Sequence, residues 1–196
     1  LGAAPLIGIR AKLASQSSGR WGSSTGDQSK FGLTIPEILK TTEALRSANL
    51  LGELRLLHFH VGSQVNDIGI IKNALQEAGQ IYIELRRLGA PMGNLDVGGG
   101  LGIDYDGSKT ATGASKNYSL QNYANDVVAT IQECCKSNNI EVPTLISESG
   151  RAITSHFSIL LFNILTKSSV HAEVPDNNNQ DSLIVENLRK TLEDIQ

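Results

Sequence analysis

Two histidines, His58 and His60, stand two residues apart at the end of an apolar run and directly before a Gly-Ser-Gln sequence. Side chains two positions apart on a β-strand point to the same face, so both imidazoles could bind one metal ion. A metal-dependent barrel hydrolase is therefore one hypothesis, but it needs further ligands at other strand ends. The remaining histidines, His156 and His171, do not follow a predicted strand. The number of ligands argues against a metal site, and we predict none.

The two histidines also differ in depth along the predicted strand. His58 lies one step deeper, where a hydrogen-bonded core residue is the more common outcome. His60 lies nearer the end of the strand and keeps a functional interpretation, as a ligand or as the wall of a pocket.

Three glycines, Gly98 to Gly100, follow the next apolar run. They do not complete a dinucleotide-binding fingerprint, because position 103 is isoleucine and no helix is predicted directly after them. Turns without side chains let backbone N–H groups approach a phosphate, and Ser63 and Arg151 could add a hydroxyl and a guanidinium. A tight turn with no ligand is the alternative.

Glu148 lies between a predicted buried strand and a glycine, so its carboxylate should have a positively charged partner unless it is solvated. Arg151 is one candidate partner and a protonated ligand is another. Three predicted strands thus end in polar or glycine residues. The carboxyl ends of parallel strands meet at one edge, where α/β enzymes build their active sites, so the sequence predicts one site at that edge.

Periodicity predicts which elements position these residues. Apolar β-rich runs predict five buried strands, at residues 5–13, 54–61, 94–97, 144–146 and 158–165. Between them, capping and stop signals predict three helices: one starting near Ile35 after a capping box at 34–37, one with its apolar stripe over 71–88, and one capped by Ser119.

Strands that alternate with amphipathic helices indicate parallel β/α units, in either a doubly wound sheet or a (β/α)8 barrel. About four units are visible, whereas a barrel has eight. A Ser/Gly-rich loop at 14–30 and a polar break at 176–182 lie outside this alternation. This pattern divides the chain into a β/α domain at 1–169 and a polar linker with a short amphipathic helix, ending at Gln196, at 170–196.

Composition narrows the class of partner. The chain has 196 residues, 40% hydrophobic and 19% charged, which suffices for a globular core. A net charge of -3 with both signs scattered argues against nucleic acid or an anionic membrane surface as the main partner, and a small polar substrate fits better.

No apolar run approaches the ~20 residues of a membrane span. The only cysteines, Cys134 and Cys135, are adjacent and poorly placed to pair, which favours a reducing compartment. Because the chain opens with Leu1 on a predicted strand, we expect a fragment of a longer protein.

Four segments, taken together, resemble a known family. "KFGL" at 30–33, "HFHVGSQ" at 58–64, "LDVGGGLGIDYDGS" at 95–108 and "SESGRAI" at 147–153 are similar, in order and spacing, to the pyridoxal-phosphate decarboxylases of the alanine-racemase-like fold. Within that superfamily the sequence looks like the plant-type biosynthetic arginine decarboxylases. The resemblance implies a partial (β/α)8 TIM-type barrel, pyridoxal 5'-phosphate, and decarboxylation of L-arginine to agmatine and CO2 in polyamine biosynthesis. It also implies Mg2+, a homodimer or larger homo-oligomer, and a location in plastid or cytoplasm.

The resemblance also assigns roles to individual residues. It implies that His60 stacks on the pyridine ring and that Glu148 holds the pyridine nitrogen, which makes these two the catalytic residues. A carboxylate there keeps the nitrogen protonated and the ring an electron sink. The other cofactor-binding residues it implies, mainly around the phosphate, are Ser63, Gly98, Gly99, Gly100, Gly150, Arg151 and, near the cofactor, Arg10.

Two family features have no match in this sequence. The Schiff-base lysine of the family is expected upstream of Leu1, and the C-terminal β-domain with its substrate-contacting cysteine and aspartate is also absent. Cys134 and Cys135 do not match that motif. A non-catalytic relative that keeps the barrel and binds a partner protein is the alternative hypothesis, which an intact pocket at His60, Gly98–Gly100 and Glu148 disfavours.

Overall fold

The computed structural model describes residues 5–14, 29–158, 160–168 and 182–195. By contacts the chain forms two units, Leu1–Ser158 and Ile159–Gln196, which we describe separately. The first unit holds a sheet and its covering helices, and the second holds helix α5 (Leu183–Ile195). That helix agrees with the short amphipathic helix predicted at the end of the chain.

The sheet of the first unit has four parallel strands: β1 (Ile7–Arg10), β2 (Leu54–His58), β3 (Asn94–Asp96) and β4 (Thr144–Ile146). Their spatial order is β1-β2-β3-β4, the same as their order along the chain. A doubly wound sheet reverses direction at a switch point, whereas the strands of a barrel follow one another around the axis. The strand order therefore favours the partial barrel over the doubly wound sheet.

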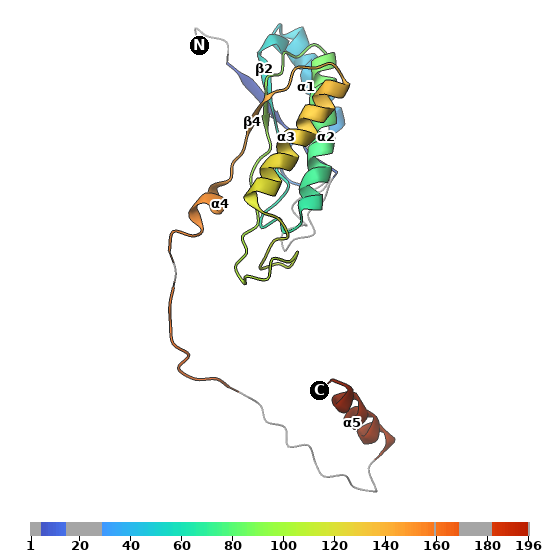
Figure 1. Cartoon of the computed structure of the whole chain (residues 1–196). Helices are drawn as coiled ribbons and strands as arrows, with labels where there is room; N and C mark the ends of the chain where they lie inside the picture. Colours follow the sequence, from blue (N-terminus) through green and yellow to red (C-terminus); the bar gives the residue numbers. More distant parts are fainter. Residues whose placement is uncertain (1–4, 15–28, 159, 169–181, 196) are drawn as a thin grey trace. The chain divides into compact units, whose positions relative to one another are not determined.

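One helix connects each pair of consecutive strands: α1 (Ile35–Ser47), α2 (Ile68–Arg87) and α3 (Leu120–Ser137). A short 3-10 turn, η3 (Leu51–Glu53), precedes β2. Right-handed crossovers place successive helices on the same face of a parallel sheet. Figure 1 shows the three helices on one side of the sheet, with α2 and α3 side by side. All three helices confirm the elements predicted from capping and periodicity.

The helix starts follow from local capping. Glu37 accepts a hydrogen bond from the backbone N–H of Thr34 at 2.7 Å, which completes the predicted capping box of α1. Ser119 Oγ accepts from the backbone N–H of Asn122 at 3.0 Å at the start of α3. Asp67 Oδ1 accepts from the N–H of Gly69 at 2.9 Å at the start of α2. Each cap satisfies an otherwise unpaired backbone donor within three residues.

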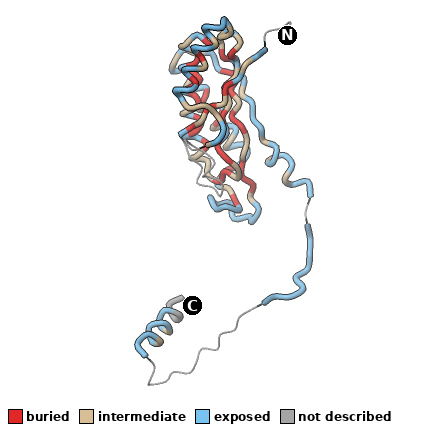
Figure 2. Tube along the Cα trace, turned by 180° about the vertical axis from the view of Figure 1, so that it is seen from behind, coloured by how far each residue is buried: buried red, intermediate tan, exposed pale blue. Residues whose placement is uncertain are grey.

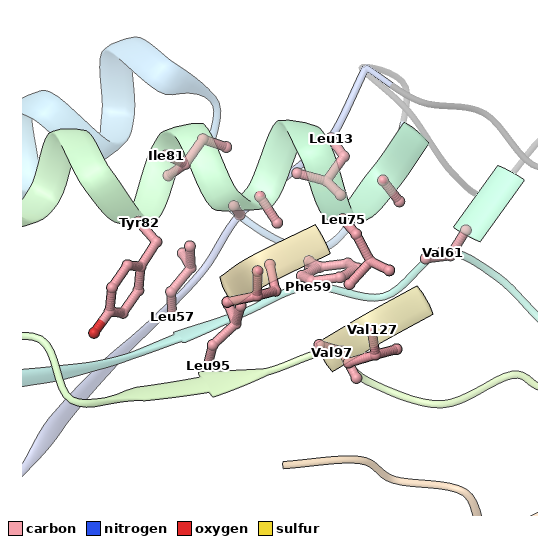
Figure 3. Close-up of a cluster of buried hydrophobic side chains, with 14 of the residues drawn as sticks. Leu13, Leu57, Phe59, Val61, Leu75, Ile81, Tyr82, Leu95, Val97 and Val127 are labelled. Atoms are coloured by element: carbon pink, nitrogen blue, oxygen red, sulfur yellow. The ribbon is translucent and has the colours of Figure 1, made fainter. Parts of the chain in front are cut away.

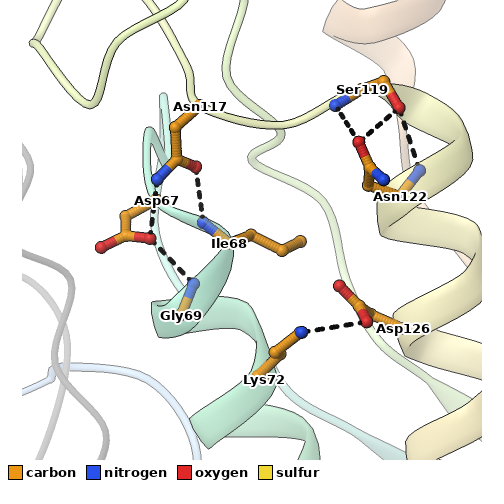
Figure 4. A network of polar contacts seen from close by, with 8 residues as sticks. All are labelled: Asp67, Ile68, Gly69, Lys72, Asn117, Ser119, Asn122 and Asp126. Carbon is orange, nitrogen blue, oxygen red and sulfur yellow. Dashed lines mark hydrogen bonds and ion pairs between the residues drawn. The ribbon is translucent and has the colours of Figure 1, made fainter.

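A polar network connects the starts of α2 and α3 (Figure 4). Asn117 accepts from the N–H of Ile68 at 3.0 Å and donates to Asp67 at 3.1 Å. Lys72 in α2 and Asp126 in α3 form an ion pair at 3.2 Å. The long segment between β3 and α3 is thereby fixed against the start of α2.

The hydrophobic core lies between the sheet and the helices, where the buried segments run through the centre of the first unit (Figure 2). Figure 3 shows strand side chains and helix side chains meeting in this layer. The fully buried members include Leu57, Phe59, Leu75, Tyr82 and Leu95. Because Leu57 and Phe59 point toward the helices, the residues that alternate with them point to the opposite face of the sheet.

The predicted strand at 158–165 is wrong. Residues 160–168 have no regular secondary structure, and Leu160, Leu161, Phe162, Ile164 and Leu165 are 79 to 92% exposed. An apolar β-rich run indicates a tendency to be buried, but a strand also needs a neighbour to pair with, and no described strand pairs here. A five-residue helix that periodicity did not predict, α4 (Gly150–Thr154), follows β4 instead.

Other expectations fall partly beyond the described residues. Most of the Ser/Gly-rich loop, the polar break up to residue 181 and the proposed boundary at 169 lie outside them. The strands are shorter than their apolar runs, since β2 ends at His58 where its run continues to residue 61. Within the described part of the chain, no helix is both long and apolar enough to cross a membrane.

Candidate functional site

The register of the sheet brings Arg10, His58 and Asp96 into one row. Arg10 pairs with His58, and His58 pairs with Asp96 on the next strand. His58 alternates with Leu57 and Phe59 of the core, so this row lies on the face away from the helices. That face is the interior of a barrel.

Asp96 is a site residue that the sequence analysis missed. Its Oδ2 lies 3.3 Å from Nδ1 of His58, at ion-pair distance but not aligned for a hydrogen bond. Its Oδ1 accepts from the backbone N–H of Gly98 at 2.9 Å. A carboxylate in the otherwise apolar "NLDV" was the available signal, but only the strand register shows which histidine it faces. His58 is only partly buried and its Nδ1 makes no hydrogen bond to any residue that the structure describes, so the expected hydrogen-bonded core residue is replaced by one whose neighbour is the Asp96 carboxylate.

A second row, two residues further along the strands, contains His60, Gly98 and Glu148. The backbone N–H of Glu148 donates to the Gly98 carbonyl at 2.8 Å, so the loops continue the alignment of the strands. A Cβ at Gly98 would lie 3.3 Å from the Cα of His60 and would overlap the carbonyl oxygen of Phe59. Because Gly98 has no side chain, the loop after β3 places no side chain at this position between His60 and Glu148.

The two rows meet at Glu148. Ligand atoms of His58, Asp96 and Glu148 all lie within 4.8 Å of one another. Glu148 and His60 are exposed, whereas His58 and Asp96 are largely covered. The carboxylate of Glu148 is therefore the accessible member of a polar cluster whose other members lie below it.

Electrostatics favour a neutral His60. Partial desolvation lowers the pKa of His60 below its ordinary value of 6.5 although the residue is exposed at the surface, and the neighbouring Arg10 and His58 lower it further, while Glu148 opposes them. The imidazole is then uncharged at neutral pH and presents a flat aromatic face, which can stack on another planar ring.

Arg10 lies close enough to His60 to lower the pKa of its imidazole. Its guanidinium carbon is 5.3 Å from the centroid of the Phe31 ring, in a cation–π contact. Phe31 belongs to the "KFGL" segment, so that segment contacts the site through Arg10.

The guanidinium of Arg151 and the hydroxyl of Ser63 meet at the loop after β2. Arg151, in the first turn of α4, donates to Ser63 Oγ at 3.1 Å and to Gln64 Oε1 at 3.3 Å. Among the residues that the structure describes, the backbone N–H groups of Gly99 and Gly100 make no hydrogen bond. A guanidinium, a hydroxyl and free N–H groups together form a site for an anion.

The glycines serve close packing as well as access to a ligand. A Cβ at Gly100 would overlap the carbonyl oxygen of Gly62, and one at Gly99 would overlap that of Glu148. The N–H of Gly98 is bound to Asp96, and the N–H of Gly150 donates to the Glu148 carbonyl at 2.9 Å. Of the predicted phosphate-binding glycines, only Gly99 and Gly100 thus offer N–H groups that are not already paired within the described residues.

The two cysteines lie in α3, away from these rows, and both are free thiols. Burial raises the pKa of Cys134 and of Cys135; Glu133 adds to the effect at Cys134, whereas at Cys135 the neighbouring Cys134 adds to it and Arg86 opposes it. Thiols with raised pKa values are weak nucleophiles at neutral pH.

A partial parallel β/α barrel with an imidazole face, a carboxylate and an anion site at the carboxyl ends of its strands defines a class of barrel whose site suits a planar ligand that carries an anionic group. Residues 3–155 match the pyridoxal-binding domain of the pyridoxal-dependent decarboxylases. The chain belongs to this family, and the match covers its residues 3–155 in a single stretch.

Curated relatives extend the match. The chain is 71% identical over 192 residues to the biosynthetic arginine decarboxylase of Prochlorococcus marinus, covering 98% of this chain, and 68% identical over 196 residues to that of Parasynechococcus marenigrum, covering all of it. It spans about 30% of the length of either relative. The crystal structure of the biosynthetic arginine decarboxylase from Campylobacter jejuni matches with a TM-score of 0.63 at 36% identity, over 75% of this chain and 23% of that one.

The residues present fit pyridoxal phosphate. Ser63, Arg151 and the free N–H groups of the glycine loop suit a phosphate, the neutral face of His60 suits the ring, and Glu148 suits a protonated ring nitrogen. By proximity alone, His58, Asp96 and Glu148 could also hold a metal ion. Membership of the pyridoxal-dependent family favours the organic cofactor over the metal-dependent hydrolase.

Proposed function

We propose that the protein containing this chain is a pyridoxal-phosphate-dependent decarboxylase that converts L-arginine to agmatine and CO2, the first step of arginine-derived polyamine synthesis. The observation that carries the proposal is the convergence of Glu148, His60 and the Ser63–Arg151 pair at one edge of the sheet. Its supporting context is a chain 62 to 71% identical to proteins named biosynthetic arginine decarboxylase.

In this proposal the chain supplies binding and electrostatics. Ser63 and Arg151 hold the phosphate by hydrogen bonds from the hydroxyl and the guanidinium, since both groups lie together in one cluster. The neutral imidazole face of His60 would stack on the pyridine ring. Glu148 accepts a hydrogen bond from the ring nitrogen, and its negative charge keeps the proton there.

When bound, pyridoxal phosphate supplies an electron-withdrawing ring that takes up the electron pair left by the departing carboxylate. Glu148 raises the capacity of that ring because a protonated nitrogen withdraws electrons more strongly. Asp96 holds the N–H of Gly98 and lies beside His58, so it fixes the floor of the site under Glu148.

An absorbance spectrum of the full-length protein, followed by assay of its products, tests the proposal. We expect a pyridoxal chromophore that changes on adding L-arginine but not ornithine or diaminopimelate, with agmatine and CO2 formed in equal amounts. Arg151→Ala should weaken cofactor retention, whereas the matched surface change Arg87→Ala on α2 should not. A protein without chromophore after incubation with pyridoxal phosphate, and without agmatine formation, would support the non-catalytic homologue instead.

Four further points belong to the proposal and rest on the resemblance alone. They are assignment to the plant type, a homodimer or larger homo-oligomer, a requirement for Mg2+, and a location in plastid or cytoplasm. The relatives named above are cyanobacterial proteins. Sedimentation of the full-length protein, activity after chelation with and without added magnesium, and cell fractionation test the last three in turn.

A further inference from the structure

Gln64 has an unusual backbone conformation for a residue with a side chain. Its φ of 53° lies in the left-handed region, which non-glycine residues adopt at a cost. It lies directly after Ser63 of the anion site, on the loop between β2 and α2. A strained conformation at such a place points to contacts of the side chain that offset the strain.

Those contacts bind both ends of the side-chain amide to one residue. Gln64 Nε2 donates to the Ile103 carbonyl at 2.7 Å, and the N–H of Ile103 donates to Gln64 Oε1 at 3.0 Å. The pair fixes the plane of the amide, and the donor and acceptor of the Ile103 backbone determine which end is oxygen. Gln64 Oε1 therefore has a defined position between the two loops.

The same oxygen accepts from Arg151 Nη1 at 3.3 Å, while Arg151 Nη2 donates to Ser63 at 3.1 Å. Two consecutive residues thus hold two nitrogens of one guanidinium, and a guanidinium is planar and rigid. Its orientation is set from the loop after β2, and its remaining N–H groups are left for a ligand.

Hydrogen bonds that do not involve the Gln64 side chain also hold the two loops together. Val65 N donates to the Gly100 carbonyl at 2.9 Å, and Gly102 N donates to the Val65 carbonyl at 3.1 Å. The buried hydroxyl of Tyr118 donates to the Val65 carbonyl at 2.7 Å and accepts from Gly102 N at 2.9 Å. What Gln64 adds to these bonds is the connection to Arg151.

We propose that Gln64 is a positioning residue that orients Arg151 toward the phosphate of the cofactor, so that Gln64 sets the preference of the protein for pyridoxal phosphate over unphosphorylated pyridoxal. The inference rests on the proposed function, since it assumes pyridoxal phosphate at this site.

The test measures dissociation constants of the full-length apoprotein for pyridoxal phosphate and for pyridoxal, by spectroscopic titration. Their ratio reports the contribution of the phosphate. We expect Gln64→Met to lower the ratio about tenfold, the effect of one hydrogen bond to a charged group. Arg151→Met should lower it at least as much, and the double variant should be no lower than Arg151→Met alone, because both act through one guanidinium.

Tyr118→Phe is the matched control, because it removes bonds between the same two loops without touching Arg151. It should weaken both ligands equally and leave the ratio unchanged. If Gln64→Met does not fold, Gln64→Gly replaces it, because glycine adopts a φ of 53° without strain.

Three outcomes overturn the inference. A Gln64 variant that weakens both ligands equally, as Tyr118→Phe does, would make Gln64 only a connection between loops. Additive effects of Gln64→Met and Arg151→Met would show that Gln64 does not act through the guanidinium. A wild-type protein that binds neither ligand would refute the proposed function together with the inference, whereas the first two outcomes leave the proposed function intact.

Discussion

Alanine at Gly100 should separate the two loops that form the anion site. Gly100 has a φ of 86°, and a Cβ there would overlap the carbonyl oxygen of Gly62, which is backbone and cannot move as a side-chain tip can. The loop after β3 must then move away from the loop after β2. That movement breaks the hydrogen bonds from Val65 N to the Gly100 carbonyl and from Gly102 N to the Val65 carbonyl.

The magnitude follows from two contributions. The left-handed conformation costs alanine about 1 to 2 kcal/mol, and two lost hydrogen bonds cost about 1 kcal/mol each, for a total of about 3 to 4 kcal/mol. Gly107 provides a matched control. Its φ is 75°, and a Cβ there would meet no atom within 4 Å, so Gly107→Ala should cost only the conformational part.

Hydrogen exchange of the Val65 amide in the full-length protein measures the difference. We expect Gly100→Ala to speed this exchange about 100-fold or more, or to yield no soluble protein, while Gly107→Ala leaves Val65 as in the wild type. Equal, wild-type exchange of Val65 in both soluble variants would refute the close approach of the two loops.

Three further changes test other parts of the structure. Glu148→Ala should lower turnover roughly 10²- to 10⁴-fold while the cofactor absorbance persists, and near-normal turnover would rule out its assigned role. Because burial lowers the pKa of His60 below 6.5, the stability that His60 contributes is present above pH 6.5 and is lost as the pH falls through the lowered pKa. An NMR titration of labelled histidine, with the signal assigned by His60→Gln, should show a midpoint below pH 6.5. A midpoint above pH 6.5 would contradict the direction of the shift. Asp67→Ala removes the cap of α2 and should lower the free energy of unfolding by about 1 kcal/mol, measured as faster amide exchange in the first turn of the helix. Lys72→Ala breaks a largely exposed ion pair and should lower it by less than about 0.5 kcal/mol. Equal effects of the two variants would mean that the cap does not stabilise the start of α2.

The failed strand at 158–165 shows the limit of local patterns. Its apolar residues led to the prediction of a buried strand, yet Leu160 and Leu165 are exposed and unpaired in the described structure. A strand forms only where a partner strand is available for pairing, and periodicity carries no information about that partner. The same reasoning explains why α4 was missed, since five residues are too few to show a helical period.

The sequence by itself determined where helices begin and which residue types the site contains. The caps at Thr34 and Ser119 act within three residues, so their effect could be read directly from the chain. The strand ends marked His60, Gly98 and Glu148 as neighbours, because carboxyl ends of parallel strands meet at one edge.

Only the tertiary structure shows which residues of the site contact one another. The strand order distinguishes the partial barrel from the doubly wound sheet, and the register places Asp96 beside His58. The loops place Gln64 between Ile103 and Arg151. Each of these depends on residues from about 40 to nearly 90 positions apart. A shift of one residue in a strand would exchange its two faces, and no local pattern carries that information, because register is set by the packing of the whole sheet.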